Sequence, residues 1–253
     1  KDKLSIESAK DVFEGTLAEV VNTLLKLVNY SIESGWTEMT KTNWASETNS
    51  KVGDSSDYAR FIVNTINERF PKYRAALSSK YQFLYEAFEA KFLTTLSAKI
   101  KACKKISAVG AQQILLDVTA MKKMLEGLPT VGLEGKNVGA PERYIKRVRR
   151  DVDDIERRLK LIWCDNSLLV ETFKALLPDA AEKEFVEIMD LKGITYDEQT
   201  KLLDAYGVAE NSTLRQELTS KHSIFNTTVS SLDETAQHLK NIMFNPFGLG
   251  QKN

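Results

Sequence analysis

The chain has 253 residues, 42% of them hydrophobic, and it carries 35 basic and 35 acidic side chains. Zero net charge excludes a global electrostatic field that would recruit nucleic acid or an anionic membrane, so a charged partner must contact a local patch. The length allows one large core or two small ones, and no window reaches the roughly 20 apolar residues of a membrane span.

Apolar residues recur at spacings of three and four along the whole chain, which predicts an all-α protein. The first helix is expected over about 8–34, with Gly35 as its end. A polar segment over 36–54 follows, with one short helix at most, and a second helix is predicted over 57–70. The predicted core stripe of the first helix consists of Val12, Leu17, Val20, Leu24, Leu27 and Val28.

Pro71 suits the first turn of a new helix, where its missing N–H would be unpaired in any case. The apolar pattern that follows continues to Cys103, about eight turns, and predicts a helix roughly 45–50 Å long. Such a length indicates an elongated bundle. Another helix is expected over 111–126, ended by Gly127 and Pro129.

Residues 129–141 are rich in glycine and proline and show little apolar periodicity, which predicts the junction between two bundles. The predicted domains are therefore a first helical bundle over 1–128, a junction loop over 129–141 and a second bundle over 142–253, in tandem along an elongated rod. Further helices are expected at 142–163, 168–177, 180–192, 196–206, 213–230 and 232–244.

Helix caps support the boundaries in the second half. Gly193 and Gly207 are predicted to end helices. Three pairs fit a capping residue followed three positions later by Glu: Asp179 with Glu182, Thr195 with Glu198, and Ser231 with Glu234.

The residue types of an enzyme site are scarce. His222 and His238 are the two imidazoles, and their neighbours form no catalytic or metal motif. Cys103 and Cys164 lack a metal-ligand spacing and are expected to be reduced thiols. The segment 132–137 lacks the glycine spacing and the hydroxyl of a phosphate loop. We therefore predict no catalytic, cofactor-binding or metal residues, no cofactor, and a protein that is not an enzyme.

Two charged clusters are candidate sites. The run over 147–160 is interpreted as a solvated face held by i,i+4 ion pairs, namely Arg147–Asp151, Arg149–Asp153, Arg150–Asp154, Asp153–Arg157, Asp154–Arg158 and Glu156–Lys160. A basic cluster without such compensation consists of Lys99, Lys101, Lys104 and Lys105. It is either a lipid-binding patch or a helix end whose lysines complement the helix dipole.

Five segments carry a family resemblance, in the family's order. They are Val52–Tyr58, Lys105–Asp117, Leu128–Gly132, Ala140–Lys146 and Ile188–Ile194. Together they resemble the C-terminal region of the vacuolar protein sorting-associated protein 53 family, over about 44–207. The chain opens at Lys1 without a methionine, so we expect a fragment of a longer polypeptide.

The resemblance implies a subunit of the Golgi-associated retrograde protein complex and of its endosomal recycling relative, which are tethers built from helical rods. Such a tether captures endosome-derived vesicles at the trans-Golgi network and promotes SNARE assembly, and small GTPases recruit it. We therefore expect a non-catalytic rod, peripheral on the cytosolic face of the trans-Golgi network and endosomes. The other complex subunits, SNAREs and small GTPases are its expected partners. The fragment itself is expected to be monomeric and not to bind nucleic acid.

The candidate partner-binding surface combines outward positions of the predicted helix 111–126 with lysines of the family-like segments: Gln112, Asp117, Lys122, Lys123, Lys146 and Lys192. A peripheral lipid-binding module that uses the basic cluster is the alternative function. An enzyme is the third reading, for which the chain offers no nucleophile, base or cofactor loop.

Overall fold

The computed structural model describes residues 6–46, 53–133, 138–221 and 223, and all regular structure in these ranges is helical. The predicted all-α class is therefore confirmed. No helix in these ranges is both long and apolar enough to cross a membrane. The predicted helix 232–244 with its cap, the end of helix 213–230, and both histidines lie outside the described residues.

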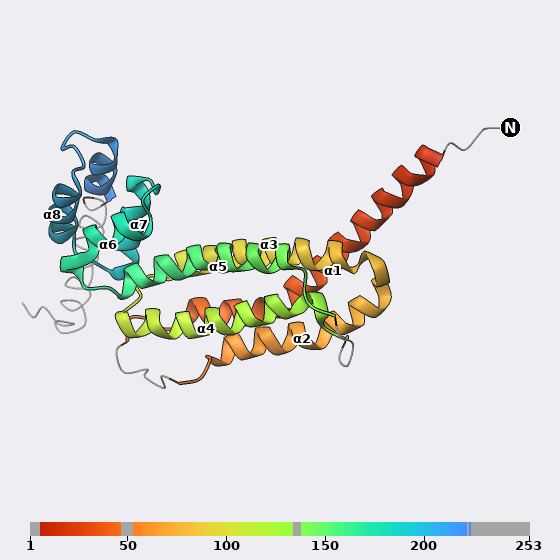
Figure 1. Ribbon diagram of the computed structural model, residues 1–253. Helices are drawn as coiled ribbons and strands as arrows, with labels where there is room; N and C mark the ends of the chain where they lie inside the picture. The colour runs from red at the N-terminus through yellow and green to blue at the C-terminus, as the bar shows by residue number, and fades with distance from the viewer. Residues whose placement is uncertain (1–5, 47–52, 134–137, 222, 224–253) are drawn as a thin grey trace, which may run out of the picture. The chain divides into compact units, whose positions relative to one another are not determined.

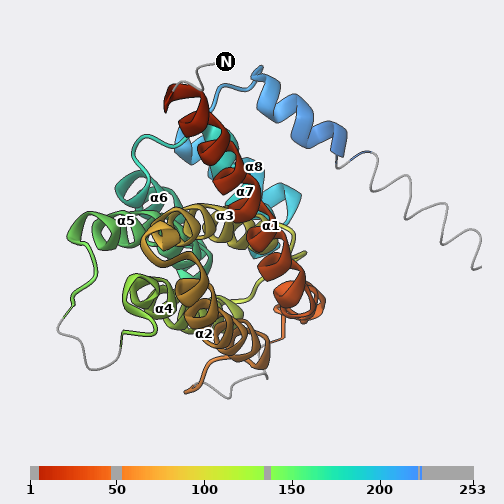
Figure 2. The ribbon, with the colours of Figure 1, turned by 90° about the vertical axis from the view of Figure 1, so that its right-hand side faces the viewer.

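Five long helices dominate the described part of the chain (Figure 1): α1 Ile6–Lys41, α2 Asp57–Leu77, α3 Tyr81–Lys101, α4 Ala108–Gly127 and α5 Glu142–Trp163. Seen from their ends (Figure 2), they form a ring in the order α1, α2, α4, α5, α3, and each helix contacts the next. The shorter helices are α6 Leu169–Leu176, α7 Glu182–Lys192 and α8 Tyr196–Tyr206, followed by a helical stretch over 213–221. The helix predicted over 142–163 is confirmed residue for residue.

Helix α1 is longer than predicted because Gly35 lies inside it. A Cβ on Gly35 would lie 2.7 Å from Ile62 Cγ1, so the glycine allows α1 and α2 to approach closely. The buried side chains belong mainly to the C-terminal half of α1: Val21, Val28, Ile32, Trp36 and Met39. Of the predicted core stripe, Val28 is buried, and the prediction is wrong for the residues before it. Val12, Val20 and Leu27 are exposed, and Leu17 and Leu24 are half-buried.

The predicted helix over 71–103 is two helices. Pro71 lies within α2, which continues to Leu77, and α3 begins at Tyr81. The break falls at Ser78, which adopts φ 47°, while its N–H donates to Arg74 O. The chain turns there so that α2 and α3 both pack against α1.

Aromatic rings fill the space between α1, α2 and α3. The ring centroids of Phe70 and Phe88 are 4.8 Å apart, those of Phe88 and Phe92 are 5.4 Å apart, and those of Trp36 and Phe92 are 5.2 Å apart. All four side chains are buried. Edge-on and tilted ring pairs of this kind stabilise a core beyond their buried area.

The chain forms two compact units: Lys1–Ala180 with Phe185–Ile194, and Ala181–Glu184 with Thr195–Asn253. Helices α4 and α5 pack against each other within the first unit. The loop 129–141, predicted as the junction between two bundles, therefore connects neighbouring helices of one unit. Glycine and proline mark where a helix ends, and such an end need not be a domain boundary.

The second unit has its own small core. Leu203, Val208 and Leu218 are buried in it. Arg215 donates to Asp204 Oδ1 at 2.5 Å and to Val208 O at 2.9 Å. Gly207 has φ 98° and ends α8 as predicted, and Gly193 of the first unit likewise follows α7 with φ 70°. Thr195 is the N-cap of α8, but its side chain makes no capping hydrogen bond.

Candidate interaction surface

The start of α4 is fixed to the loop that follows α1. Ser107 is the N-cap of α4, and its hydroxyl oxygen accepts a hydrogen bond from Gly110 N at 3.0 Å. The Ser107 backbone N–H and hydroxyl both donate to Trp44 O, at 2.9 and 3.0 Å. Gly110 faces the same carbonyl, and a Cβ at this position would collide with it. The capping residue thus joins two segments that are more than 60 positions apart.

The C-terminal end of α7 is hydrogen-bonded to the segment just before α4 and to the end of α5. Ile106 N donates to Leu191 O at 2.7 Å, and Lys192 Nζ donates to Ile162 O and Cys164 O, each at 2.7 Å. Lys192 therefore binds carbonyl groups at the C-terminal end of α5, where the helix dipole favours a cation. The aliphatic part of Lys105 lies over Gly193, with Cδ 2.5 Å from where a Cβ would be.

These contacts surround a hollow between the start of α4 and the end of α5, which we call the α4 hollow. Trp163, half exposed at 50%, forms part of its wall. Hydrogen bonds from the Ser167 hydroxyl and N–H lower the pKa of Asp165, so this carboxylate is ionised, whereas burial raises the pKa of the Cys164 thiol. The hollow is lined by Ala45, Lys105, Ile106, Ser107, Ala108, Ile162, Trp163, Cys164, Asp165, Asn166 and Lys192.

The structure divides the predicted basic cluster. Lys99 Nζ lies 3.0 Å from Glu33 Oε1, and Lys101 Nζ lies 2.7 Å from Glu187 Oε2. The prediction that the cluster lacks acidic partners is therefore wrong for these two lysines, because their partners come from distant helices. Lys104 and Lys105 are exposed, and no ion pair within the described ranges involves either of them.

Asp117 is buried, so the prediction that it is a surface residue is wrong. Its Oδ1 accepts hydrogen bonds from Ser56 N at 2.7 Å, at the N-cap of α2, and from Gln113 Nε2 at 3.4 Å. Burial raises the pKa of this carboxyl group, and the hydrogen bonds from Ser56 and Gln113 oppose that rise. Asp117 thus connects the start of α2 to the middle of α4.

The other candidate residues differ in their surroundings. Lys192 is used inside the molecule, as described above, which also corrects its predicted surface role. Lys122 pairs with Glu156 of α5 at 3.1 Å, and Lys146 pairs with Glu142 at 2.7 Å. Lys123 is exposed on α4, and Gln112 is half-buried. The structure therefore does not bring the six candidates together into one patch.

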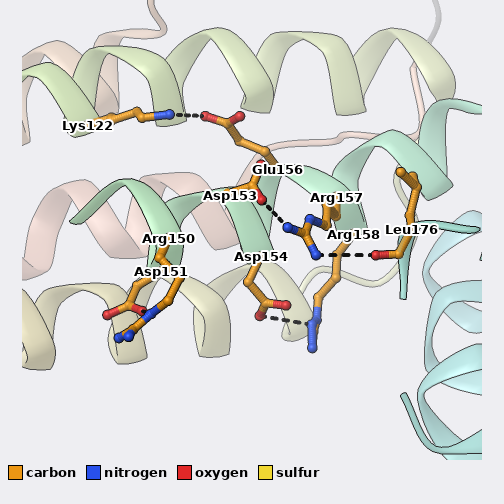
Figure 3. Close-up of polar contacts among 9 residues, drawn as sticks. All are labelled: Lys122, Arg150, Asp151, Asp153, Asp154, Glu156, Arg157, Arg158 and Leu176. Atoms are coloured by element: carbon orange, nitrogen blue, oxygen red, sulfur yellow. Dashed lines mark hydrogen bonds and ion pairs between the residues drawn. The ribbon is translucent and has the colours of Figure 1, made fainter. Parts of the chain in front are cut away.

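The charged run of α5 is ion-paired, but with different partners from those predicted. Two of the six predicted i,i+4 pairs form, Asp153–Arg157 and Asp154–Arg158 (Figure 3). Glu156 turns instead to Lys122 of α4, and Arg150 pairs with its neighbour Asp151. Arg147 and Arg149 pair with Glu89 of α3 and Glu126 of α4. The face therefore stabilises helix–helix packing as well as the helix itself.

The far end of α4 is fixed by side chains that reach its last carbonyl groups. Tyr144 OH donates to Leu125 O at 3.0 Å, Tyr81 OH donates to Leu128 O at 2.9 Å, and the Arg74 guanidinium donates to Pro129 O. All five family-like segments thus lie at one end of α4 or the other, or along it. This arrangement was not predicted from the sequence, in which the segments are dispersed over about 140 residues.

The fold and these surfaces define an all-α helical-bundle protein whose most distinctive sequence segments lie along α4 and at its two ends. Residues 112–194 match the family described as "Vacuolar protein sorting-associated protein 53 C-terminus". This stretch runs from the second turn of α4 to two residues past the end of α7, and the resemblance inferred from the sequence is confirmed.

Known proteins similar to this chain carry the same name. The chain is 28% identical to "Vacuolar protein sorting-associated protein 53 A" of Arabidopsis thaliana over 206 residues, which are 81% of the chain and 24% of the relative. It is 25% identical to the Caenorhabditis elegans homolog over 210 residues, 80% of the chain and 26% of the relative. The chain thus spans about a quarter of the length of these relatives. No solved structure matches it.

Proposed function

We propose that this chain is a non-catalytic part of a vesicle-tethering complex subunit that acts in retrograde transport from endosomes to the trans-Golgi network. The observation that supports this most is the similarity to relatives named for vacuolar protein sorting over about four fifths of the chain. In this role the chain binds other proteins, namely complex subunits, SNAREs or small GTPases. It does so at the cytosolic face of the trans-Golgi network and endosomes, as a peripheral protein.

The α4 hollow is the surface we propose for such a contact. Tryptophan is enriched among the residues that dominate binding energy at interfaces, and Trp163, which is half exposed, lines the hollow together with Lys105. The walls of the hollow are held by the backbone hydrogen bonds of Ser107 and Ile106, so the surface is pre-organised before a partner arrives.

The test replaces Trp163 by Ala and Lys105 by Glu together in the full-length protein, in cells that lack the endogenous copy. We expect a receptor that cycles between endosomes and the trans-Golgi network to be missorted, because the contact with the partner is weakened. Co-purification of the other subunits then shows whether that partner is a complex subunit. The matched control is Phe83→Ala, which removes an exposed aromatic ring at the N-terminal end of α3, whereas Lys105 follows the C-terminal end of this helix. Normal sorting by the double variant would contradict the role of the hollow.

A lipid-binding module is the second candidate, supported by Lys104 and Lys105, which are exposed and form no ion pair with the residues that the structure describes. Each basic residue near an anionic leaflet contributes about 1 kcal/mol, so two lysines assist binding but do not anchor the protein. Flotation with phosphatidylserine-containing vesicles tests this candidate. Binding that is unchanged after Lys104→Glu and Lys105→Glu would remove it.

A further inference from the structure

One positive charge in the α4 hollow has no counter-charge among the described residues. The charged side chains that line the hollow are Lys105, Asp165 and Lys192. Lys192 Nζ donates to two backbone carbonyl groups, and its charge also stabilises the Asp165 carboxylate. Lys105 is exposed and forms no ion pair with any residue in the described ranges. The charges of Lys192 and Asp165 thus offset each other, which leaves the charge of Lys105 for a partner.

The aliphatic part of Lys105 is held in place by Gly193. Its Cδ, Cε and Cγ atoms lie 2.5, 2.6 and 2.9 Å from where a Cβ on Gly193 would be, so the side chain passes through space that any other residue would fill. Gly193 also has φ 70°, a left-handed conformation that favours glycine. Ordering a long side chain on binding costs free energy, and a lysine that is already seated lowers this cost.

An apolar ring lines the same hollow. Trp163 is 50% exposed, and the hollow has a volume of about 690 Å³, which is in the range of pockets that hold small ligands. A partner that fills it inserts a few side chains, one of which is apolar and contacts the indole ring. Ser107 and Ala108, at the start of α4, are also part of the lining, so the positive end of the helix dipole has the same sign as the charge of Lys105.

The lining distinguishes between anionic partners. Phosphorylated segments are bound by clusters of arginines, and no arginine is among the residues that line the hollow. An anionic lipid surface is bound stably by several basic residues together, whereas the hollow offers Lys105 as its one cation without a counter-charge in the described part of the chain. A single carboxylate on a protein segment matches this lining.

We infer that the α4 hollow binds an acidic segment of a partner protein, in which an Asp or Glu side chain pairs with Lys105 and a neighbouring apolar side chain packs on Trp163. This inference rests on the proposed function of the hollow and adds the chemistry of its partner.

Selection from a phage-displayed library of random peptides on the whole chain tests this inference. Peptides that bind the unsubstituted chain but not Trp163→Ala are collected, so that the selection reports on the hollow. We expect the enriched peptides to share an acidic residue beside an apolar one. Enriched peptides that are basic or uncharged, or the absence of any peptide whose binding depends on Trp163, would overturn the inference.

Fluorescence anisotropy with one enriched acidic peptide then assigns the charge. Lys105→Met keeps an aliphatic stem over Gly193 and is expected to weaken binding by about tenfold or more, because the carboxylate loses its counter-charge. Lys105→Glu is expected to bind the same peptide once its acidic residue is replaced by Lys. The control is Lys123→Glu, at an exposed position of α4 outside the hollow, which is expected to change binding by less than about twofold.

Circular dichroism shows whether each variant keeps its helicity. Unchanged binding by Lys105→Met, or displacement of the peptide by phosphatidylserine-containing vesicles, would overturn the inference, the latter because Lys105 would then serve a lipid surface. The result can be told apart from that of receptor sorting. If the double variant missorts the receptor while the selection yields basic peptides, the acidic partner is wrong and the proposed function of the hollow stands.

Discussion

Gly110, in the first turn of α4, occupies a position where a side chain would collide with the Trp44 carbonyl group. We expect Gly110→Ala to lower the free energy of unfolding by about 1–3 kcal/mol, as overpacking does, even though alanine favours a helix. Urea denaturation followed by circular dichroism measures this. The same carbonyl group accepts both Ser107 bonds, so the clash acts on the helix cap itself.

Gly127, the last residue of α4, is the matched control. A Cβ there would meet nothing within 4 Å, and its φ of −78° suits any residue. Gly127→Ala is therefore expected to leave stability unchanged or to raise it by up to about 1 kcal/mol. Equal losses from both substitutions would show that the close approach at Trp44 is not the cause.

Asp117 makes stability depend on pH. Burial raises the pKa of this carboxyl group in the folded chain above the value of about 3.9 in an unfolded one. The protonated side chain therefore contributes most to the free energy of unfolding below about pH 3.9, and this contribution is lost as the pH rises through the pKa of the folded chain. Asp117→Asn keeps an acceptor for Ser56 N and does not ionise. The variant is therefore expected to gain stability relative to the unsubstituted chain as the pH rises from about 3 to 7, in urea denaturation at each pH. A pH-independent difference would contradict this.

The buried position of Asp117 was predictable in principle. It lies three residues after Ile114 and four before Met121, both buried, so helical periodicity alone places it on the inner face. An acidic residue on such a face indicates a buried hydrogen-bond acceptor. Its partner, the backbone of Ser56, was not predictable, because backbone donors carry no sequence signal.

At the scale of helices, an ion pair joins α5 to α3, and its acidic member is more deeply buried than its basic member. Glu89 is buried, with 1% of its side chain exposed, and its Oε2 accepts from Arg147 Nε at 2.9 Å; the Arg147 side chain is 32% exposed. Burial raises the pKa of Glu89, and Arg147 opposes this rise. The arginine thus compensates a carboxylate that solvent does not reach.

We expect Arg147→Met to lower the free energy of unfolding by roughly 3 kcal/mol, the lower end of the cost of breaking a buried pair, because Arg147 is partly solvated. Arg150→Met on the same helix is the control. Its partner is Asp151, and its side chain is 74% exposed, so a change within about 0.5 kcal/mol is expected. Chemical denaturation compares the two variants, and similar losses would indicate that helix propensity, not the pair, is responsible.

The apolar spacing predicted the interiors of helices more accurately than it predicted where helices end. The strong period of α5 predicted both of its ends. By contrast, Gly35 and Pro71 suggested breaks where packing keeps α1 and α2 continuous. The real break at Ser78 has no distinctive local residue. It is fixed by how α2 and α3 pack on α1, which is tertiary information.

At the scale of the whole molecule, the structure and the sequence place the division of the chain differently. The sequence indicated a boundary in the loop 129–141, whereas the contacts put α4 and α5 in one compact unit that extends to Ile194. A chain cut after Pro141 would lose the helix that covers α4, including Tyr144 and Val148, which are buried. A chain cut after Ile194 would keep the contacts within this unit.

The truncation at Ile194 is therefore expected to unfold cooperatively in urea, at a midpoint near that of the first transition of the full chain. The truncation at Pro141 is expected to aggregate or to lack a cooperative transition, because it exposes the apolar face of α4 to water. Circular dichroism and size-exclusion chromatography of both pieces distinguish the two divisions. If the Pro141 piece folded alone while the Ile194 piece did not, two tandem bundles would describe the chain better, and α5 would then pack on α4 as one domain docking on another.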